Sequence, residues 1–170
     1  MKKMEKSVEN LNSAFAGESQ ASRRYLIFAQ KAEEEGFPQV SKLFRAAAEA
    51  ETVHAFNHIR TAGETRSTVE SLQNAVEGEA FEFKRMYPDY IKTAKKENNI
   101  QAVWSFNVAS QVEQVHANLF TRAMKALKAG KELVKVDYYV CNVCGNTIEK
   151  EAPSKCHICG SPKEKILKVP

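Results

Sequence analysis

Two pairs of residues in this 170-residue sequence repeat the pattern Glu-x-x-His, and side chains of both types bind metal ions. The pairs are Glu51 with His54 and Glu113 with His116. Residues three apart in a helix lie one turn apart on the same face, so both side chains of a pair can reach one point. A single pair is more often an exposed helix pair, but two in one chain favour a metal site.

A lone glutamate precedes each pair at a nearly constant distance. The spacing from Glu18 to Glu51 equals the spacing from Glu79 to Glu113 to within a single residue. The chain therefore reads as a doubled helical hairpin, in which each half supplies one Glu and then a Glu-x-x-His. This set is typical of di-iron and di-manganese carboxylate bundles of the ferritin-like type. Mostly oxygen ligands, with one imidazole per metal, favour iron or manganese over copper.

Further side chains on the same helix faces are candidates for the site. Glu82 lies one turn beyond Glu79 and is a seventh candidate ligand. Tyr25 and Tyr87 fit as core aromatic residues, and they also lie within about two turns of ligand carboxylates, where they can hydrogen-bond to them. We interpret His58 as an ordinary helix-end histidine rather than a zinc ligand.

All four cysteines lie near the end of the sequence, in the pattern Cys141-x-x-Cys144-Gly and Cys156-x-x-Cys159-Gly. Two such knuckles, so close together in the sequence, predict a tetrathiolate metal site. Disulfides are the alternative, and an expected cytoplasmic location argues against them. The spacing leaves open a structural zinc ribbon or an iron site that carries one electron, and His157 is a competing candidate ligand.

Long helices must position the carboxylates and histidines, and the sequence predicts four of them. Residues 1–134 contain two prolines, and apolar residues recur at steps of three and four. Glycine, proline and capping residues mark the helix boundaries, which we place near Gly36–Pro38, Gly63, Ser67–Thr68, residues 98–99 and Gly130. Pro88 should kink the third helix, because it lacks an N–H group and its ring clashes with the preceding turn.

The predicted fold class is mainly α. We expect a four-helix bundle over residues 1–134 and a small β-rich metal domain over residues 135–170, where β-prone segments and three prolines replace the helical pattern. No apolar run approaches the roughly 20 residues that span a bilayer, and no secretory signal follows the N-terminus, so we expect a cytoplasmic protein without a membrane segment. The net charge of +4 is spread among acidic residues, so no nucleic-acid partner is expected.

These motifs resemble those of the rubrerythrins, over nearly the whole chain. That family joins an N-terminal ferritin-like di-iron bundle to a C-terminal rubredoxin-like Fe(Cys)4 domain. The resemblance rests on Ala-Gly-Glu18-Ser, Glu51-Thr-Val-His54, Gly-Glu79-Ala-Phe-Glu82, Met-Tyr87-Pro88, Glu113-Gln-Val-His116 and the four cysteines. The sequence departs from the family at His157, where proline is common.

The resemblance implies the ligands of two iron ions in a carboxylate-bridged site. They are Glu18, Glu51, His54, Glu79, Glu82, Glu113 and His116. Glu51 and Glu113 would bridge the irons, while one iron would exchange Glu82 in the oxidised state for His54 in the reduced state. The four cysteines would hold a third iron, and zinc can replace it in a preparation.

The resemblance also implies an oxidoreductase that reduces hydrogen peroxide to water in defence against oxidative stress. The implied catalytic residues are His54, Glu82, Tyr25 and Tyr87. Electrons would pass through the Fe(Cys)4 centre from a rubredoxin or an NAD(P)H-dependent reductase. Two alternatives stay open: ferritin-like Fe(II) oxidation with iron storage, and a scaffold protein with a zinc ribbon.

The connection between the second and third predicted helices is short. Ferritin-like bundles cross over there along the whole bundle, about 40 Å. Roughly residues 64–67 are available, and four to six residues reach only about 13 to 22 Å. We therefore predict a domain-swapped homodimer, in which the first two helices of one chain meet the last two of its partner.

Overall fold

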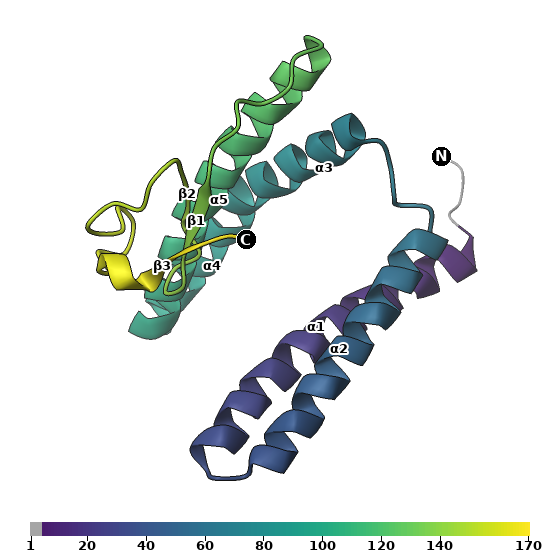
Figure 1. The fold of residues 1–170 in the computed structure, drawn as a ribbon, viewed down its shortest axis with the longest axis vertical. Coiled ribbons are helices and arrows are strands. Elements are labelled where there is room, and N and C mark those ends of the chain that lie inside the picture. Colours follow the sequence, from purple (N-terminus) through teal and green to yellow (C-terminus); the bar gives the residue numbers. More distant parts are fainter. Residues whose placement is uncertain (1–4) are drawn as a thin grey trace. The chain divides into compact units, whose positions relative to one another are not determined.

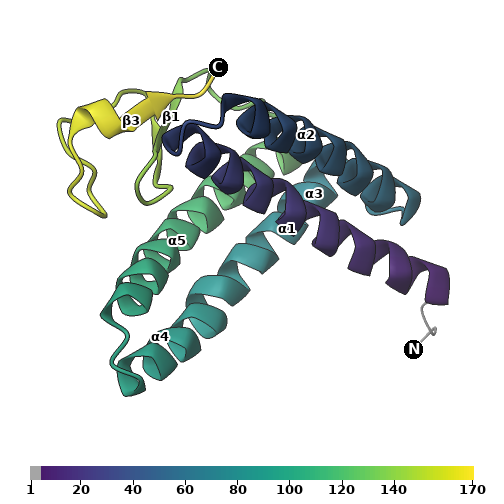
Figure 2. The same ribbon diagram turned by 90° about the horizontal axis from the view of Figure 1, so that it is seen from below.

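The computed structural model describes residues 5–170, which belong to two compact units that meet in sequence between Arg66 and Ser67. The first unit is a helical hairpin of α1 (Lys6–Glu34) and α2 (Pro38–Thr61), which run side by side in Figures 1 and 2. The predicted boundary holds: Gly36 has φ +80°, and Pro38 opens α2. Alanine side chains are buried along both helices, which lets the two backbones approach closely.

The second unit begins with helices that pair in a second hairpin. They are α3 (Thr68–Phe81), a π-helical segment (Glu82–Met86), α4 (Tyr87–Lys96) and α5 (Ile100–Lys128). Ser67 caps α3 as predicted: its side chain accepts a hydrogen bond from the Glu70 N–H, and the Glu70 carboxylate accepts one from the Ser67 N–H. In Figure 2, α5 lies beside α3 and α4.

A π-helical segment directly precedes Pro88, the residue predicted to kink this helix. The Tyr87 N–H donates to the carbonyl oxygen of Glu82, five residues earlier. Pro88 itself has no N–H to donate, and in a regular helix its ring would press on the carbonyl of the residue four positions earlier. A wider turn immediately before Pro88 relieves that clash and places an irregular turn next to the candidate ligand Glu82.

The cysteine-containing end of the second unit is built on a small antiparallel sheet. Its strands are β1 (Tyr138–Cys141), β2 (Thr147–Glu149) and β3 (Ile166–Lys168), in the order β2-β1-β3. A short 3-10 helix, Lys163–Lys165, precedes β3. Cys141, Cys156 and Ile166 form the buried core. The sequence predicts that a β-prone segment starts at Val136. In the structure β1 starts two residues later, at Tyr138.

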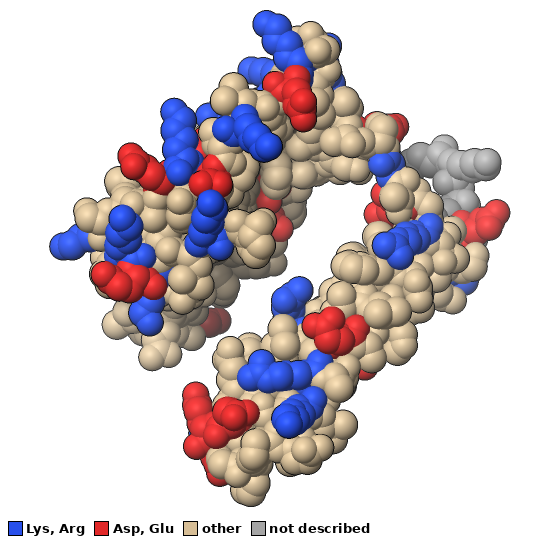
Figure 3. Space-filling view, viewed as in Figure 1, with Lys and Arg blue, Asp and Glu red and all other residues tan. Residues whose placement is uncertain are grey.

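The surface mixes charges and apolar side chains. Basic and acidic side chains are interspersed on the face shown in Figure 3. Within residues 5–170, no helix combines the length and apolar character that crossing a membrane requires. In the first unit, Ile27, Leu43, Val53 and Phe56 are each more than half exposed in the single chain. A two-helix hairpin can bury only the faces between its helices, so much apolar surface stays uncovered.

Candidate metal centres

The first unit brings together one glutamate from α1 and a Glu-x-x-His pair from α2. Ligand atoms of Glu18, Glu51 and His54 all lie within 4.8 Å of one another. The Nδ1 atom of His54 lies 2.8 Å from Oε2 of Glu51. The Glu51 side chain is 21% exposed and that of His54 is 54% exposed, so the group is open on its histidine side. Nearby, Ser22 and Thr52 share a hydrogen bond of 3.0 Å that ties α1 to α2.

The second unit repeats the arrangement with α3 and α5. Ligand atoms of Glu79, Glu113 and His116 also lie within 4.8 Å of one another. The Nδ1 atom of His116 lies 2.8 Å from Oε2 of Glu113 and 3.6 Å from Oε1 of Glu79. These side chains are 17–24% exposed. Each unit therefore holds one Glu-Glu-His triad, with the ligand atoms that the spacing of the sequence predicts.

Crowded negative charge marks the second triad. Burial raises the pKa of Glu79 to about 7, and hydrogen bonding to Glu113 and the charges of Glu113 and Glu82 add to the effect. Burial also raises the pKa of Glu82, with the Glu113 charge acting in the same direction and His116 opposing it. A divalent cation would relieve this repulsion, so the residues fit a metal with oxygen and imidazole ligands.

The remaining predicted residues lie close to the triads without joining them. Glu82 is outside the second triad but close enough for its charge to raise the Glu79 pKa. Tyr25 packs on Phe44, with ring centroids 6.1 Å apart, and Tyr87 packs on Phe106 at 6.2 Å. Burial, and then the charges of Glu113, Glu82 and Glu79, raise the pKa of Tyr87. Among the described residues, neither tyrosine hydroxyl group hydrogen-bonds to a ligand carboxylate.

The four cysteines converge on one point between the two knuckles. Their sulfur atoms lie within 4.8 Å of one another, and the Cys141–Cys159 and Cys144–Cys156 sulfur pairs are each 3.6 Å apart, with all four thiols free. Metal–sulfur bonds of about 2.3 Å in a tetrahedron put sulfurs about 3.8 Å apart, so these distances fit a tetrathiolate site. Each knuckle turns through a glycine with positive φ, Gly145 at 82° and Gly160 at 74°.

Hydrogen bonds to the sulfur atoms make the four thiols unequal. Burial would raise the pKa of Cys159, but hydrogen bonding with the side chain and backbone of Ser161, and with Cys144 and Cys141, lowers it to about 6. Burial raises the pKa of Cys144. The buried Asn146 side chain donates to Sγ of Cys156 at 3.7 Å. Neither Asn146 nor Ser161 was predicted from the sequence. Their positions directly after the two Cys-Gly turns are the signal that identifies them.

Comparisons with known proteins identify the family of the chain. The rubrerythrin family model matches residues 9–124. Rubrerythrin-2 of Clostridium acetobutylicum is 36% identical over 92% of both chains, and nigerythrin of Nitratidesulfovibrio vulgaris is 32% identical over 93% of this chain and 84% of its own. A solved structure of nigerythrin in a partially reduced state matches with a TM-score of 0.57 and 30% identity, covering 98% of this chain and 88% of that one.

These matches confirm the predicted fold class, a ferritin-like helical bundle with a small rubredoxin-like domain. They also confirm the predicted cofactor types, since the chain carries the carboxylate and histidine candidates for a di-iron site together with a four-cysteine site. The relatives indicate an oxidoreductase. The chain belongs to the rubrerythrin family, whose members are di-iron proteins linked to oxidative stress.

Proposed function

We propose that this protein is a non-haem di-iron peroxidase that reduces hydrogen peroxide to water. The observation that carries the proposal is that one chain combines two Glu-Glu-His triads with a four-cysteine site. Reducing one peroxide to two waters consumes two electrons and two protons, and a tetrathiolate iron centre can return electrons one at a time. Storage of oxidised iron, the alternative, needs no returning electrons, so the cysteine site favours the peroxidase.

The seven predicted ligands would hold the two irons. When bound, the iron pair would supply the two electrons that break the O–O bond. We propose that Glu51 and Glu113 bridge the two metal positions, because carboxylates can change binding mode as the metal charge rises. We also propose that His54 and Glu82 exchange at one position, since an anionic carboxylate compensates a higher metal charge better than a neutral imidazole.

A hydrogen-bond donor for peroxide or product water lies beside the second triad, at Tyr87. The raised pKa of Tyr87 keeps its hydroxyl group protonated and able to donate a hydrogen bond. We propose that Tyr87 and Tyr25, which occupy equivalent aromatic pairs in the two hairpins, are catalytic residues that orient peroxide or a ligand carboxylate.

We propose that residues 1–134 and 135–170 are the two functional domains, and that the protein is a domain-swapped homodimer. Helix α2 has 24 residues and is about 36 Å long, whereas the connection of residues 62–67 reaches at most about 22 Å. The exposed apolar side chains of the first hairpin also favour assembly. The proposed electron donor is a rubredoxin or an NAD(P)H-dependent reductase in the cytoplasm, since family members use rubredoxin-type donors.

Stopped-flow spectroscopy of the iron-loaded protein tests the reaction. The protein is reduced without oxygen and mixed with one equivalent of peroxide per di-iron site. We expect rapid oxidation of the di-iron site, followed by return of the red Fe(Cys)4 absorbance as that centre gives up its electron. Glu51→Gln should slow the first phase strongly, while Glu49→Gln, which changes an exposed glutamate on the same helix, should leave both phases intact.

Two outcomes would overturn the proposal. Slow reaction with peroxide, together with mineral formation from added Fe(II) and dioxygen, would indicate iron storage. Colourless protein from cells grown with abundant iron would show that zinc occupies the cysteine site and would remove its role in electron transfer. Light scattering tests the assembly separately. A monomeric mass for protein that binds two irons per chain at full occupancy would contradict the swapped dimer.

A further inference from the structure

A hydrogen bond joins the second triad to the cysteine-containing end of the same unit. The Nε2 atom of His116 lies 2.9 Å from the side-chain oxygen of Thr147, the first residue of β2. The other ring nitrogen, Nδ1, faces Glu113 and Glu79. Both nitrogens of the candidate metal ligand therefore have partners, one from the triad and one from the sheet.

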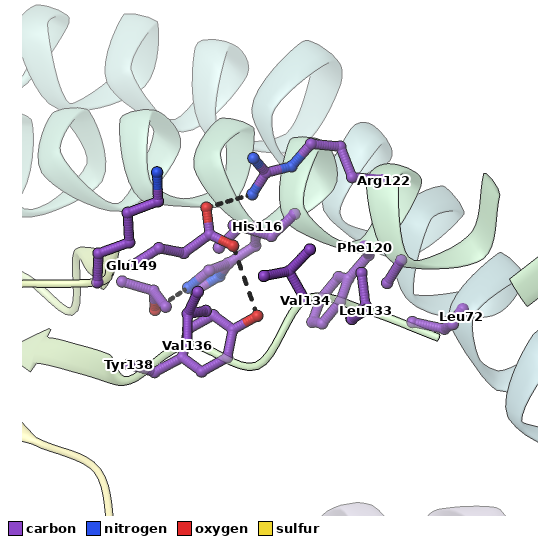
Figure 4. A pocket seen from close by; sticks show the side chains of 13 residues that line it. Leu72, His116, Phe120, Arg122, Leu133, Val134, Val136, Tyr138 and Glu149 are labelled. Atoms are coloured by element: carbon purple, nitrogen blue, oxygen red, sulfur yellow. Dashed lines mark hydrogen bonds and ion pairs between the residues drawn. The ribbon is translucent and has the colours of Figure 1, made fainter. Parts of the chain in front are cut away.

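A second contact joins the same strand to the same helix. Arg122 on α5 forms an ion pair with Glu149, which also receives a hydrogen bond of 3.5 Å from the Tyr138 hydroxyl group. Figure 4 shows Arg122 and Tyr138 reaching Glu149 from different elements. Thr147 and Glu149 are two residues apart in a strand, so their side chains leave it on the same side, toward α5.

The surroundings of this contact are largely apolar. A pocket of about 640 Å³ adjoins His116 and Thr147, and Phe120, Leu133 and Val136 help to line it. The first cysteine knuckle is also close to α5, because a Cβ atom placed on Gly145 would lie 3.9 Å from a methyl group of Val112. The hydrogen bond therefore lies where β2 and the first cysteine knuckle approach α5.

We infer that Thr147 is a positioning residue for the metal ligand His116. A histidine that binds a metal through Nδ1 must carry its proton on Nε2, and that N–H needs an acceptor. The Thr147 hydroxyl oxygen provides the acceptor. It fixes the tautomer and the ring orientation, so that the Nδ1 lone pair points at the position shared with Glu79 and Glu113.

The hydroxyl group suits this position because it can act in either direction. In the metal-free protein, a His116 protonated on Nδ1 can donate to Glu113 and accept at Nε2 from the threonine O–H. With a metal at Nδ1, a neutral His116 ring would carry its proton on Nε2, and the threonine oxygen would accept the hydrogen bond. A residue with only a donor or only an acceptor would satisfy one of these two states and leave the other with an unpaired group.

Zinc binding to the full-length protein tests the inference independently of any reaction. With zinc in all sites, the Nε2–H proton of His116 is observed by NMR on 15N-labelled protein, and affinity is measured by competition with a chromophoric chelator. Thr147→Val keeps the branched shape and removes the hydroxyl group. We expect its carboxylate site to bind zinc about tenfold more weakly, and the Nε2–H proton to exchange faster with water.

Matched variants separate the hydrogen bond from docking of the strand. Thr147→Ser should restore both readouts, because it retains the hydroxyl group. Arg122→Ala removes the neighbouring ion pair but leaves the Thr147 hydroxyl in place, so it should keep the Nε2–H signal. Wild-type zinc affinity and proton exchange in Thr147→Val, or equal loss in Thr147→Ser, would overturn the inference. A lack of peroxidase activity would leave these readouts unchanged and would count only against the proposed function.

Discussion

Metal loading should release a proton from Glu79, and the number released should follow its raised pKa. With a pKa of about 7, the Glu79 carboxyl group is about 90% protonated at pH 6 and about 10% protonated at pH 8 in the metal-free protein. A carboxylate ligand must lose its proton to bind a metal. Glu79 should therefore release about 0.9 proton per site at pH 6 and about 0.1 at pH 8.

The assay compares the wild-type protein with Glu79→Gln at saturating Fe(II) without oxygen. Protons are counted with an indicator dye in weakly buffered solution. Histidine ligands also release protons, but they do so in both proteins, so the difference between the two isolates Glu79. The wild-type excess should be about 0.9 proton at pH 6 and should nearly vanish at pH 8.

The same number of protons from both proteins at pH 6 would refute this reasoning. It would mean that the Glu79 carboxyl group is ionised before the metal arrives, in spite of its burial and the adjacent Glu113 and Glu82 charges. Glu77→Gln is the matched control, because Glu77 is an exposed residue of the same helix and its loss should not change the count.

Three further predictions concern stability and redox potential. The Glu79 pKa is higher in the folded protein than the ordinary value of 4.5, so the metal-free fold holds an extra proton. The fold should therefore lose stability as pH rises from about 4.5 toward 7, which urea unfolding in the presence of a chelator measures. Ser67→Ala removes the capping box of α3 and should lower the free energy of unfolding by about 1 kcal/mol, measured in the same way. In the metal-free chain the Cys159 thiol donates to Oγ of Ser161 at 3.1 Å. An iron-bound Cys159 sulfur carries no proton, so the Ser161 hydroxyl group would donate to it and stabilise the more negative reduced centre. Ser161→Ala should therefore give a lower reduction potential in a redox titration of the iron-loaded protein.

The sequence was sufficient to predict the two Glu-Glu-His clusters, because the spacing of their residues follows the helix period. Glu113 and His116 must share a face wherever their helix lies, so the triads could be foreseen without knowing how the helices pack. Two Cys-x-x-Cys-Gly turns likewise predict their own local geometry. Helix ends at Gly36 and Ser67 agree with the structure for the same reason, since a positive φ and a capping box are decided by a few neighbouring residues.

The sequence could not predict which side chain supports a ligand from another element. Thr147 and His116 are far apart in the sequence and meet because a strand docks on α5. Apolar packing and the Arg122–Glu149 ion pair accompany that docking, and neither has a spacing rule. Thr147 therefore could not be singled out from its position in the chain, although it lies three residues after a cysteine ligand.

The π-helical segment Glu82–Met86 corresponds to a single extra residue in the second half of the sequence. The aromatic pairs of the two hairpins match, at 6.1 Å and 37° in the first and 6.2 Å and 38° in the second. The spacing from tyrosine to phenylalanine is also identical in the two halves, at Tyr25–Phe44 and Tyr87–Phe106. The spacing from the lone glutamate to the tyrosine differs, because it is one residue longer from Glu79 to Tyr87 than from Glu18 to Tyr25.

The π-helical segment Glu82–Met86 lies within the longer spacing and takes up the extra residue. It does so without displacing Tyr87 from its aromatic pair, so the insertion changes only the turn that begins with Glu82. In the first hairpin, the residue three positions after Glu18 is Ala21, which offers no ligand. The extra residue and the extra carboxylate thus occur together in one half of a doubled chain. The two halves therefore offer unequal sets of candidate ligands, and that inequality supports the proposal that His54 and Glu82 exchange at one metal position only.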